Sequence, residues 1–179
     1  MTTSPRRHAL RHGSTGFIGF RGRLDDPLNH EGWDQMQHAL GSQRWDRIVT
    51  SPRKRCSFFA QHLAHEWQVP LVVDPLVAEL DFGDWEGLTV AEVFEQAPLE
   101  LERFWADPWS FPPPHGEPMD HFSHRVGRAW TNICAHGEAT LLITHGGVIR
   151  LLHHRLTGSS RDRLLHYPVP QGSLHDLAF

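Results

Sequence analysis

Four short runs of apolar residues recur along the chain, and polar or glycine-rich residues follow each run at once. They span residues 8–10, 48–49, 71–73 and 139–143. None of them alternates between apolar and polar positions, which is typical of strands that are buried on both faces of a parallel sheet. We therefore expect four buried strands in a largely parallel sheet.

Helical patterns fill the intervals between these runs. The clearest is a stripe of apolar residues at helical spacing: Met119, Phe122, Val126, Trp130 and Ile133. Gly158 is a natural stop for the last helix. The predicted helices span residues 31–41, 53–67, 119–136 and 147–157. Strands that alternate with helices predict the α/β class, here a three-layer sandwich whose central, mainly parallel sheet carries helices on both faces.

The segment from about 84 to 118 interrupts this alternation. It contains a helical pattern near 89–106 and then a proline-rich loop at 112–114. We expect one domain over residues 1–179, with this segment as an insertion that covers the active-site end of the sheet. Its aromatic residues are expected mainly in the core, and any that line a pocket mouth would favour a flat aromatic substrate. The residues concerned are Trp85, Trp105, Trp109 and Phe111.

Composition narrows the possible functions. The chain has 179 residues and a formal net charge of −4, which argues against a nucleic-acid binder that works by bulk electrostatics. No apolar run is long enough to span a membrane, and no signal-peptide pattern follows the basic N-terminal residues. The two cysteines, Cys56 and Cys134, are expected to be reduced thiols. These features predict a soluble cytoplasmic protein, either a monomer or a dimer.

Histidine is the unusual count, at 15 residues. The pairs His62/His65 and His121/His124 have a spacing that can chelate zinc, but no third ligand completes a recognisable pattern. We therefore expect no metal and no cofactor. A histidine-rich metal-binding protein is the alternative, and elemental analysis of purified protein distinguishes the two.

Chemically capable side chains follow the predicted strands. They are Arg11, His12, Arg55, Glu79 and His145. Ligands of open α/β sheets bind outside the carboxyl ends of the strands, so these side chains should converge. Arginine supplies forked cationic donors for a phosphate dianion, an unprotonated histidine can be a nucleophile, and a carboxylic acid can protonate a leaving alkoxide. The set predicts a phosphoryl-transfer site.

The motifs that contain these residues resemble the histidine phosphatase superfamily, which has the phosphoglycerate mutase-like fold. They are Arg11-His12-Gly13, Ser51-Pro52-x-x-Arg55, Glu79 ahead of residues 81–87, and residues 144–147. The resemblance covers residues 9–157 and implies a metal-independent phosphomonoester hydrolase that acts on a small phosphorylated substrate.

The resemblance also implies a role for each residue. His12 would become the phosphohistidine, and Glu79 would be the proton donor, with Asp81 and Asp84 as the next candidates. Arg11, Arg55 and a protonated His145 would bind the phosphoryl group, and Thr15 and Gly146 would add phosphate contacts. Glu86 and Glu117 are expected to hold loops rather than to react.

Several stretches, among them residues 82–87 and 144–150, are similar to the α-ribazole phosphatases of cobalamin nucleotide-loop assembly. The alternatives are a broad-specificity sugar-phosphate or phosphohistidine-protein phosphatase, a phosphoglycerate mutase-like mutase, and an inactive protein that binds a phosphorylated ligand. Ser14 departs from the family pattern, which usually has glutamate there. Departures of this kind fall in loops that would contact the substrate.

Overall fold

A five-stranded sheet forms the centre of the computed structural model, which describes residues 5–177. The start of the N-terminal stretch, where no signal peptide is expected, lies outside the described residues. The strands lie in the order β3-β2-β4-β1-β5, and the first four are parallel while β5 runs antiparallel to β1. They are β1 (Arg7–Arg11), β2 (Arg47–Thr50), β3 (Leu71–Val73), β4 (Thr140–Thr144) and β5 (Leu174–Asp176).

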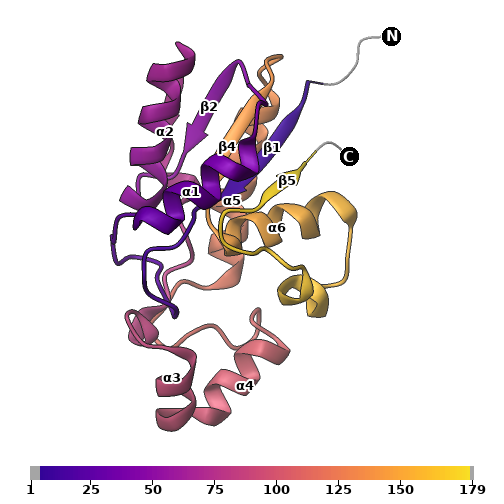
Figure 1. Ribbon diagram of the computed structural model, residues 1–179. Helices are drawn as coiled ribbons and strands as arrows, with labels where there is room; N and C mark the ends of the chain where they lie inside the picture. The colour runs from indigo at the N-terminus through magenta and orange to yellow at the C-terminus, as the bar shows by residue number, and fades with distance from the viewer. Residues whose placement is uncertain (1–4, 178–179) are drawn as a thin grey trace.

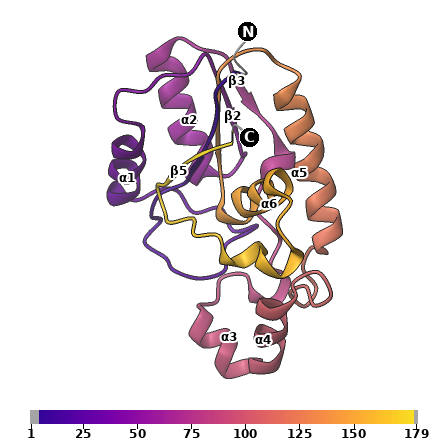
Figure 2. The ribbon, with the colours of Figure 1, turned by 90° about the vertical axis from the view of Figure 1, so that its right-hand side faces the viewer.

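Helices cover both faces of the sheet, as the sequence predicts (Figure 2). The helices are α1 (His30–Leu40), α2 (Lys54–Trp67), α3 (Val90–Gln96), α4 (Pro98–Ala106), α5 (Met119–Cys134) and α6 (Gly146–Thr157). One core cluster joins α1 and α2 to Leu141 and Ile143 of β4, and a second joins α5 and α6 to Leu142. Each apolar residue of β4 therefore packs into one of two cores. This explains why the apolar run of β4 is unbroken.

Two strand predictions need correction. Residues 71–73 form a strand but are not buried on both faces, because β3 is an edge strand and leaves Val72 and Val73 37% and 48% exposed. The apolar pattern also does not predict β5, which has only one apolar residue among its three, Leu174. This strand exists because the open edge of β1 pairs with it.

The helix predicted near 89–106 is two helices. Thr89 begins α3 with a capping box that it forms with Glu92. Pro98 begins α4, because proline has no N–H to continue the ladder of α3 but fits the first turn of a new helix.

Helices α3 and α4 lie together at one end of the molecule, away from both chain termini (Figure 1). Val90, Phe104 and Trp105 of this pair reach a cavity that is also lined by Arg11 at the end of β1 and Gly146 at the start of α6. Among residues 5–177, no helix is both long enough and apolar enough to cross a bilayer.

Candidate active site

His12 follows the last residue of β1 and is held by its main chain and its ring. Its N–H donates to Thr144 O at 3.0 Å, and its Nδ1 lies 2.8 Å from the carbonyl oxygen of Gly13. A carbonyl oxygen only accepts, so Nδ1 carries the proton and Nε2 is left with its lone pair. Burial, followed by the charge of Arg55, lowers the pKa of His12 to about 3. The imidazole is thus neutral at pH 7 and has the form that a nucleophile requires.

Two guanidinium groups, one buried and one partly buried, act electrostatically on this ring. Arg11 donates from Nη1 to Val169 O, and Arg55 is fully buried. The Nε atoms of both arginines are buried and have no hydrogen-bond partner within residues 5–177. Buried cationic N–H groups without partners are energetically unfavourable, so these two are suited to an anion that enters the cavity.

Arg55 differs in one respect from the expectation of a forked phosphate donor. Its Nη1 donates to Leu24 O at 2.7 Å, and its Nη2 donates to Arg21 O at 2.7 Å and to Gly22 O at 3.2 Å. Only Nε is free of main-chain acceptors, so a bidentate contact through both Nη atoms is not open in this arrangement. The loop that contains residues 21–24 therefore fixes the orientation of Arg55.

Glu86 holds the same loop from its other side. Its carboxylate accepts the N–H groups of Gly22, Arg23 and Leu24, at distances from 2.8 to 3.2 Å, and that of Phe82 at 3.1 Å. This contact set confirms the loop-holding role that the sequence predicts for Glu86. The N–H groups of this loop donate to the carboxylate of Glu86, and its carbonyl oxygens accept from the guanidinium of Arg55. One stretch of backbone therefore fixes both side chains.

His145 follows β4 and lies next to His12, where it is fully buried. Its ring centroid is 5.3 Å from that of His12, and its Nε2 is 2.7 Å from Ser51 Oγ. Burial, and then the charge of Arg55, lowers its pKa well below the usual value. His145 is therefore neutral in the ligand-free protein, and its protonation beside a bound phosphoryl group stays a prediction. Cys56 Sγ, 3.8 Å from Nε2, adds no charge, because burial raises its pKa to about 12.

Glu79 is anchored at the start of α6. Its Oε2 accepts the Gly147 N–H at 3.0 Å, and a Cβ on Gly147 would overlap the carboxylate. Only glycine allows this approach. The preceding main chain is held by Arg125, which donates to the carbonyls of Leu76, Ala78 and Glu79 at 2.7 to 3.0 Å.

Arg125 is itself oriented by Glu117. Two guanidinium nitrogens of Arg125 meet the two carboxylate oxygens of Glu117 at 2.7 and 2.8 Å. Burial opposes the charge of Glu117, but this pairing lowers its pKa. Glu117 thus holds a loop, as expected, and the loop it holds carries Glu79.

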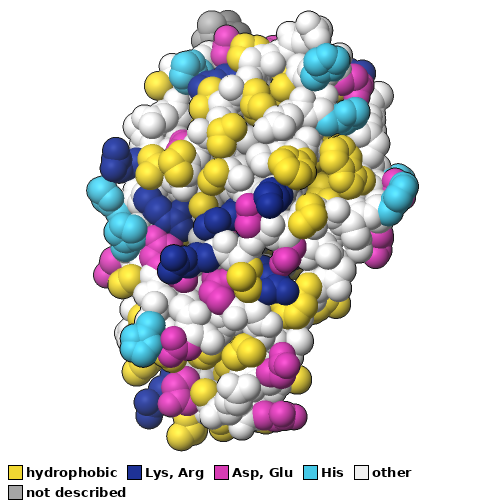
Figure 3. Space-filling model, turned by 90° about the vertical axis from the view of Figure 1, so that its left-hand side faces the viewer, with side chains coloured by type: hydrophobic (Ala, Val, Ile, Leu, Met, Phe, Trp, Pro, Cys, Tyr) yellow, Lys and Arg dark blue, Asp and Glu magenta, His cyan; other side chains and the backbone are white. Residues whose placement is uncertain are grey.

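The candidate site contains a cavity of about 420 Å³. His12, Arg11, Arg55, Glu79, Thr15 and Gly146 all line it, whereas His145 is fully buried and does not. Lys and Arg side chains gather across the middle of one face of the molecule, at the height where the sheet meets α3 and α4 (Figure 3).

Sequence reasoning missed three polar residues of this lining: Arg21, Arg150 and Gln171. Arg150 donates from Nε to Tyr167 O at 3.0 Å, and its pKa is lowered by burial. Its position four residues beyond Gly146 in the first turns of α6 was the available signal. No comparable signal marks Gln171.

Ser14, which departs from the family pattern, stabilises the turn after β1. Its Oγ accepts the Gly16 N–H at 3.1 Å and the side-chain amide of Asn29 at 3.2 Å. Asn29 in turn caps α1 through Gly32 N. The hydroxyl therefore ties the end of β1 to the start of α1.

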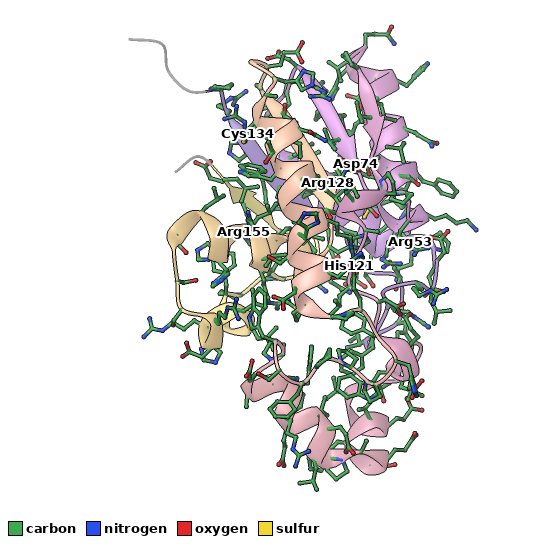
Figure 4. The ribbon with its side chains drawn as sticks, turned by 180° about the vertical axis from the view of Figure 1, so that it is seen from behind. Arg53, Asp74, His121, Arg128, Cys134 and Arg155 are labelled. Carbon is green, nitrogen blue, oxygen red and sulfur yellow. The ribbon has the colours of Figure 1, made fainter. Side chains whose placement is uncertain are left out.

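The paired histidines do not gather metal ligands. His62 lies 3.6 Å from Glu66, and His121 lies 2.6 Å from Glu117. His121 is on the part of α5 nearer to α3 and α4 (Figure 4). Throughout the described part of the chain, no group of three or more His, Cys, Asp or Glu side chains could hold a metal ion.

Comparisons with known proteins agree on one family. The sequence pattern of the histidine phosphatase superfamily (branch 1) matches residues 7–179. A bifunctional protein of Mycobacterium tuberculosis is 37% identical over 159 residues, which is 84% of this chain and 43% of that protein. The chain thus spans less than half the length of its mycobacterial relatives. An adenosylcobalamin/α-ribazole phosphatase of Escherichia coli is 29% identical and covers 91% of this chain and 84% of its own.

Solved structures share the fold. The α-ribazole phosphatase of Shigella flexneri superimposes with a TM-score of 0.78 at 27% identity, over 94% of this chain and 88% of that one. A mycobacterial glucosyl-3-phosphoglycerate phosphatase gives a TM-score of 0.83 at 25% identity, over 95% and 88%. The phosphoglycerate mutase-like fold is therefore as predicted. With a match over nearly its whole length, the chain belongs to the histidine phosphatase superfamily, branch 1.

Proposed function

We propose that the protein is a phosphomonoester hydrolase that transfers the phosphoryl group of a small substrate to Nε2 of His12 and then to water. One observation supports this most directly. An unprotonated imidazole nitrogen lies in a cavity with two buried Nε donors, on Arg11 and Arg55, that have no hydrogen-bond partner among the described residues. A nucleophile and unsatisfied cationic donors are what a phosphate dianion requires.

The remaining residues have roles in the same scheme. Glu79 protonates the leaving oxygen, and Thr15 and Gly146 contact the phosphoryl group. His145 is neutral before the substrate binds. A dianion beside it would favour its protonated form, because an opposite charge stabilises the charged state.

For the substrate we favour α-ribazole 5′-phosphate. This choice is supported by relatives that are named α-ribazole phosphatases and by the aromatic side chains in the cavity lining. A sugar-phosphate phosphatase is the second candidate, because a glucosyl-3-phosphoglycerate phosphatase is among the structural neighbours.

A screen of phosphate monoesters tests the function. We expect phosphate release, with the highest kcat/KM for α-ribazole 5′-phosphate among a set that also contains sugar phosphates and a phosphohistidine protein. A higher kcat/KM for a sugar phosphate would replace the substrate assignment, and no release from any ester would contradict the hydrolase.

Catalysis should be independent of metal ions. The guanidinium groups of Arg11 and Arg55 supply the positive charge that metal ions supply in other phosphatases. We expect dialysis against a chelator to leave kcat unchanged. A loss of activity that added zinc or magnesium restores would assign part of that charge to a metal.

A further inference from the structure

The part of the cavity beyond His12, Arg11 and Arg55 has an apolar wall. Phe17 and Ile18 reach it from the loop after β1, and Phe104 and Trp105 reach it from α4. Leu165, on the turn after α6, also lines it. The charged end and the apolar end thus belong to one cavity and come from different segments of the chain.

Several of these apolar side chains are exposed to solvent. Ile18 is 84% exposed, Trp105 44% and Val90 43%, although all three line the cavity. They come from three segments of the chain. Large apolar side chains that are exposed to solvent around the mouth of a cavity indicate a surface that a ligand covers.

Uncharged polar side chains are few in this lining. Within the described residues, Thr15 and Gln171 supply its only hydroxyl and amide side chains, beside the charged Arg21 and Arg150. A polyhydroxylated alcohol would exchange its hydrogen bonds to water for contacts with hydrocarbon, which is unfavourable. An aromatic or aliphatic group would gain from the same contacts.

The ring of Phe17 is held in place. The guanidinium carbon of Arg21 lies 3.7 Å from the ring centroid, and Arg21 Nε lies 2.8 Å from an oxygen of Asp26. One face of the ring is therefore covered by a side chain that is itself ion-paired, which limits the rotation of Phe17. This one part of the apolar wall is accordingly held in place before a ligand arrives.

We propose that the apolar wall is a leaving-group subsite for the aromatic or otherwise apolar alcohol of a phosphate monoester. This inference rests on the proposed hydrolase function. The phosphorus–oxygen ester bond breaks, the phosphoryl group bonds to Nε2 of His12, and the alcohol oxygen takes its proton from Glu79. Water then releases phosphate from His12. The subsite thus selects the alcohol while Arg11 and Arg55 bind the phosphoryl group.

Three alkyl esters test the subsite: 2-phenylethyl phosphate, ethyl phosphate and glycerol 1-phosphate. All three release alkoxides and make similar demands on the proton donor, so differences report contacts of the alcohol. We expect kcat/KM for 2-phenylethyl phosphate to exceed that for either other ester by about tenfold or more. Trp105→Ala should remove most of this preference, because it should lower kcat/KM for 2-phenylethyl phosphate far more than kcat/KM for ethyl phosphate.

Phe94→Ala is the matched control. Phe94 lies on α3, is 49% exposed and does not line the cavity, so its removal should leave the preference intact. Melting temperatures of both variants verify the fold.

Equal kcat/KM for the three esters in the unmodified protein would overturn the subsite, as would an equal loss on all three in a stable Trp105→Ala protein. If none of the esters is hydrolysed, the proposed function fails and the subsite is tested by binding. Calorimetry with 2-phenylethylphosphonate and ethylphosphonate should then show tighter binding of the former, and equal affinities would overturn the subsite.

Discussion

Replacement of His12 by alanine should lower phosphatase activity by about 10⁴-fold or more, because it removes the nitrogen that we propose as the acceptor of the phosphoryl group. The ring accepts no hydrogen bond that the fold needs, and its Nδ1 donates only to the neighbouring Gly13 carbonyl. The main-chain bond from His12 N to Thr144 O is independent of the side chain. The variant should therefore fold, and circular dichroism and melting temperature verify this.

Trapping of the intermediate shows whether the lost activity is nucleophilic. Rapid quenching of the unmodified protein with a ³²P-labelled substrate should give a protein-bound phosphate that is stable in base and labile in acid, as a phosphohistidine is. The His12→Ala protein should give none. Substantial turnover by a folded His12→Ala protein, or label on another residue, would contradict the assignment.

Replacement of Glu79 by glutamine should separate substrates by their leaving groups. An alkoxide leaves poorly without a proton, whereas nitrophenolate is a stable anion. General acid catalysis contributes about 10²–10⁴-fold, so loss of that size is expected for an alkyl phosphate and only a modest loss for 4-nitrophenyl phosphate. The comparison is made on the phosphorylation step of His12, measured by rapid quench, so that hydrolysis of the intermediate does not mask it.

Glutamine has nearly the same shape and can still accept the Gly147 N–H, so the anchor at the start of α6 is retained. Asp84→Asn is the matched control. Asp84 is an exposed carboxylate a few residues after Glu79 in the chain, and it pairs with His115 at 2.9 Å. It should affect neither substrate. Equal losses on both substrates for Glu79→Gln would move the proton donor to Asp84 if Asp84→Asn slows only the alkyl phosphate, and to Asp81 if Asp84→Asn has no effect.

The layers of this fold can be predicted from the sequence, because the spacing of apolar residues within each segment determines whether it forms a strand or a helix. The apolar run of β4 and the stripe of α5 each carry enough buried side chains to specify the element on its own. Convergence of His12, Arg55 and Glu79 was equally predictable, since the carboxyl ends of parallel strands meet at one edge. By contrast, β5 is too short to leave a pattern, and its pairing with β1 decides it.

Main-chain contacts between distant segments explain what the sequence did not predict. Arg55 uses both Nη atoms on carbonyls about thirty residues away, at positions 21–24, and carbonyls have no residue-specific signature. Arg150 and Arg11 similarly depend on carbonyls of residues 167 and 169. The neutral state of His145 results from complete burial next to Arg55, which no local pattern encodes.

The place of β1 in the sheet has a consequence for biosynthesis. Among the strands of residues 5–177, β1 comes earliest along the chain, yet its two neighbours are β4 and β5, so Arg7 pairs with Thr140 and His8 with Asp176. Contacts between residues so far apart in sequence form slowly, because a long loop must close before they stabilise anything. On the ribosome, the strand that precedes His12 has no partner among the described strands until β4, at residues 140–144, has been synthesised. His12 therefore enters its cavity late in folding, and a nascent chain that stops before β4 lacks this arrangement.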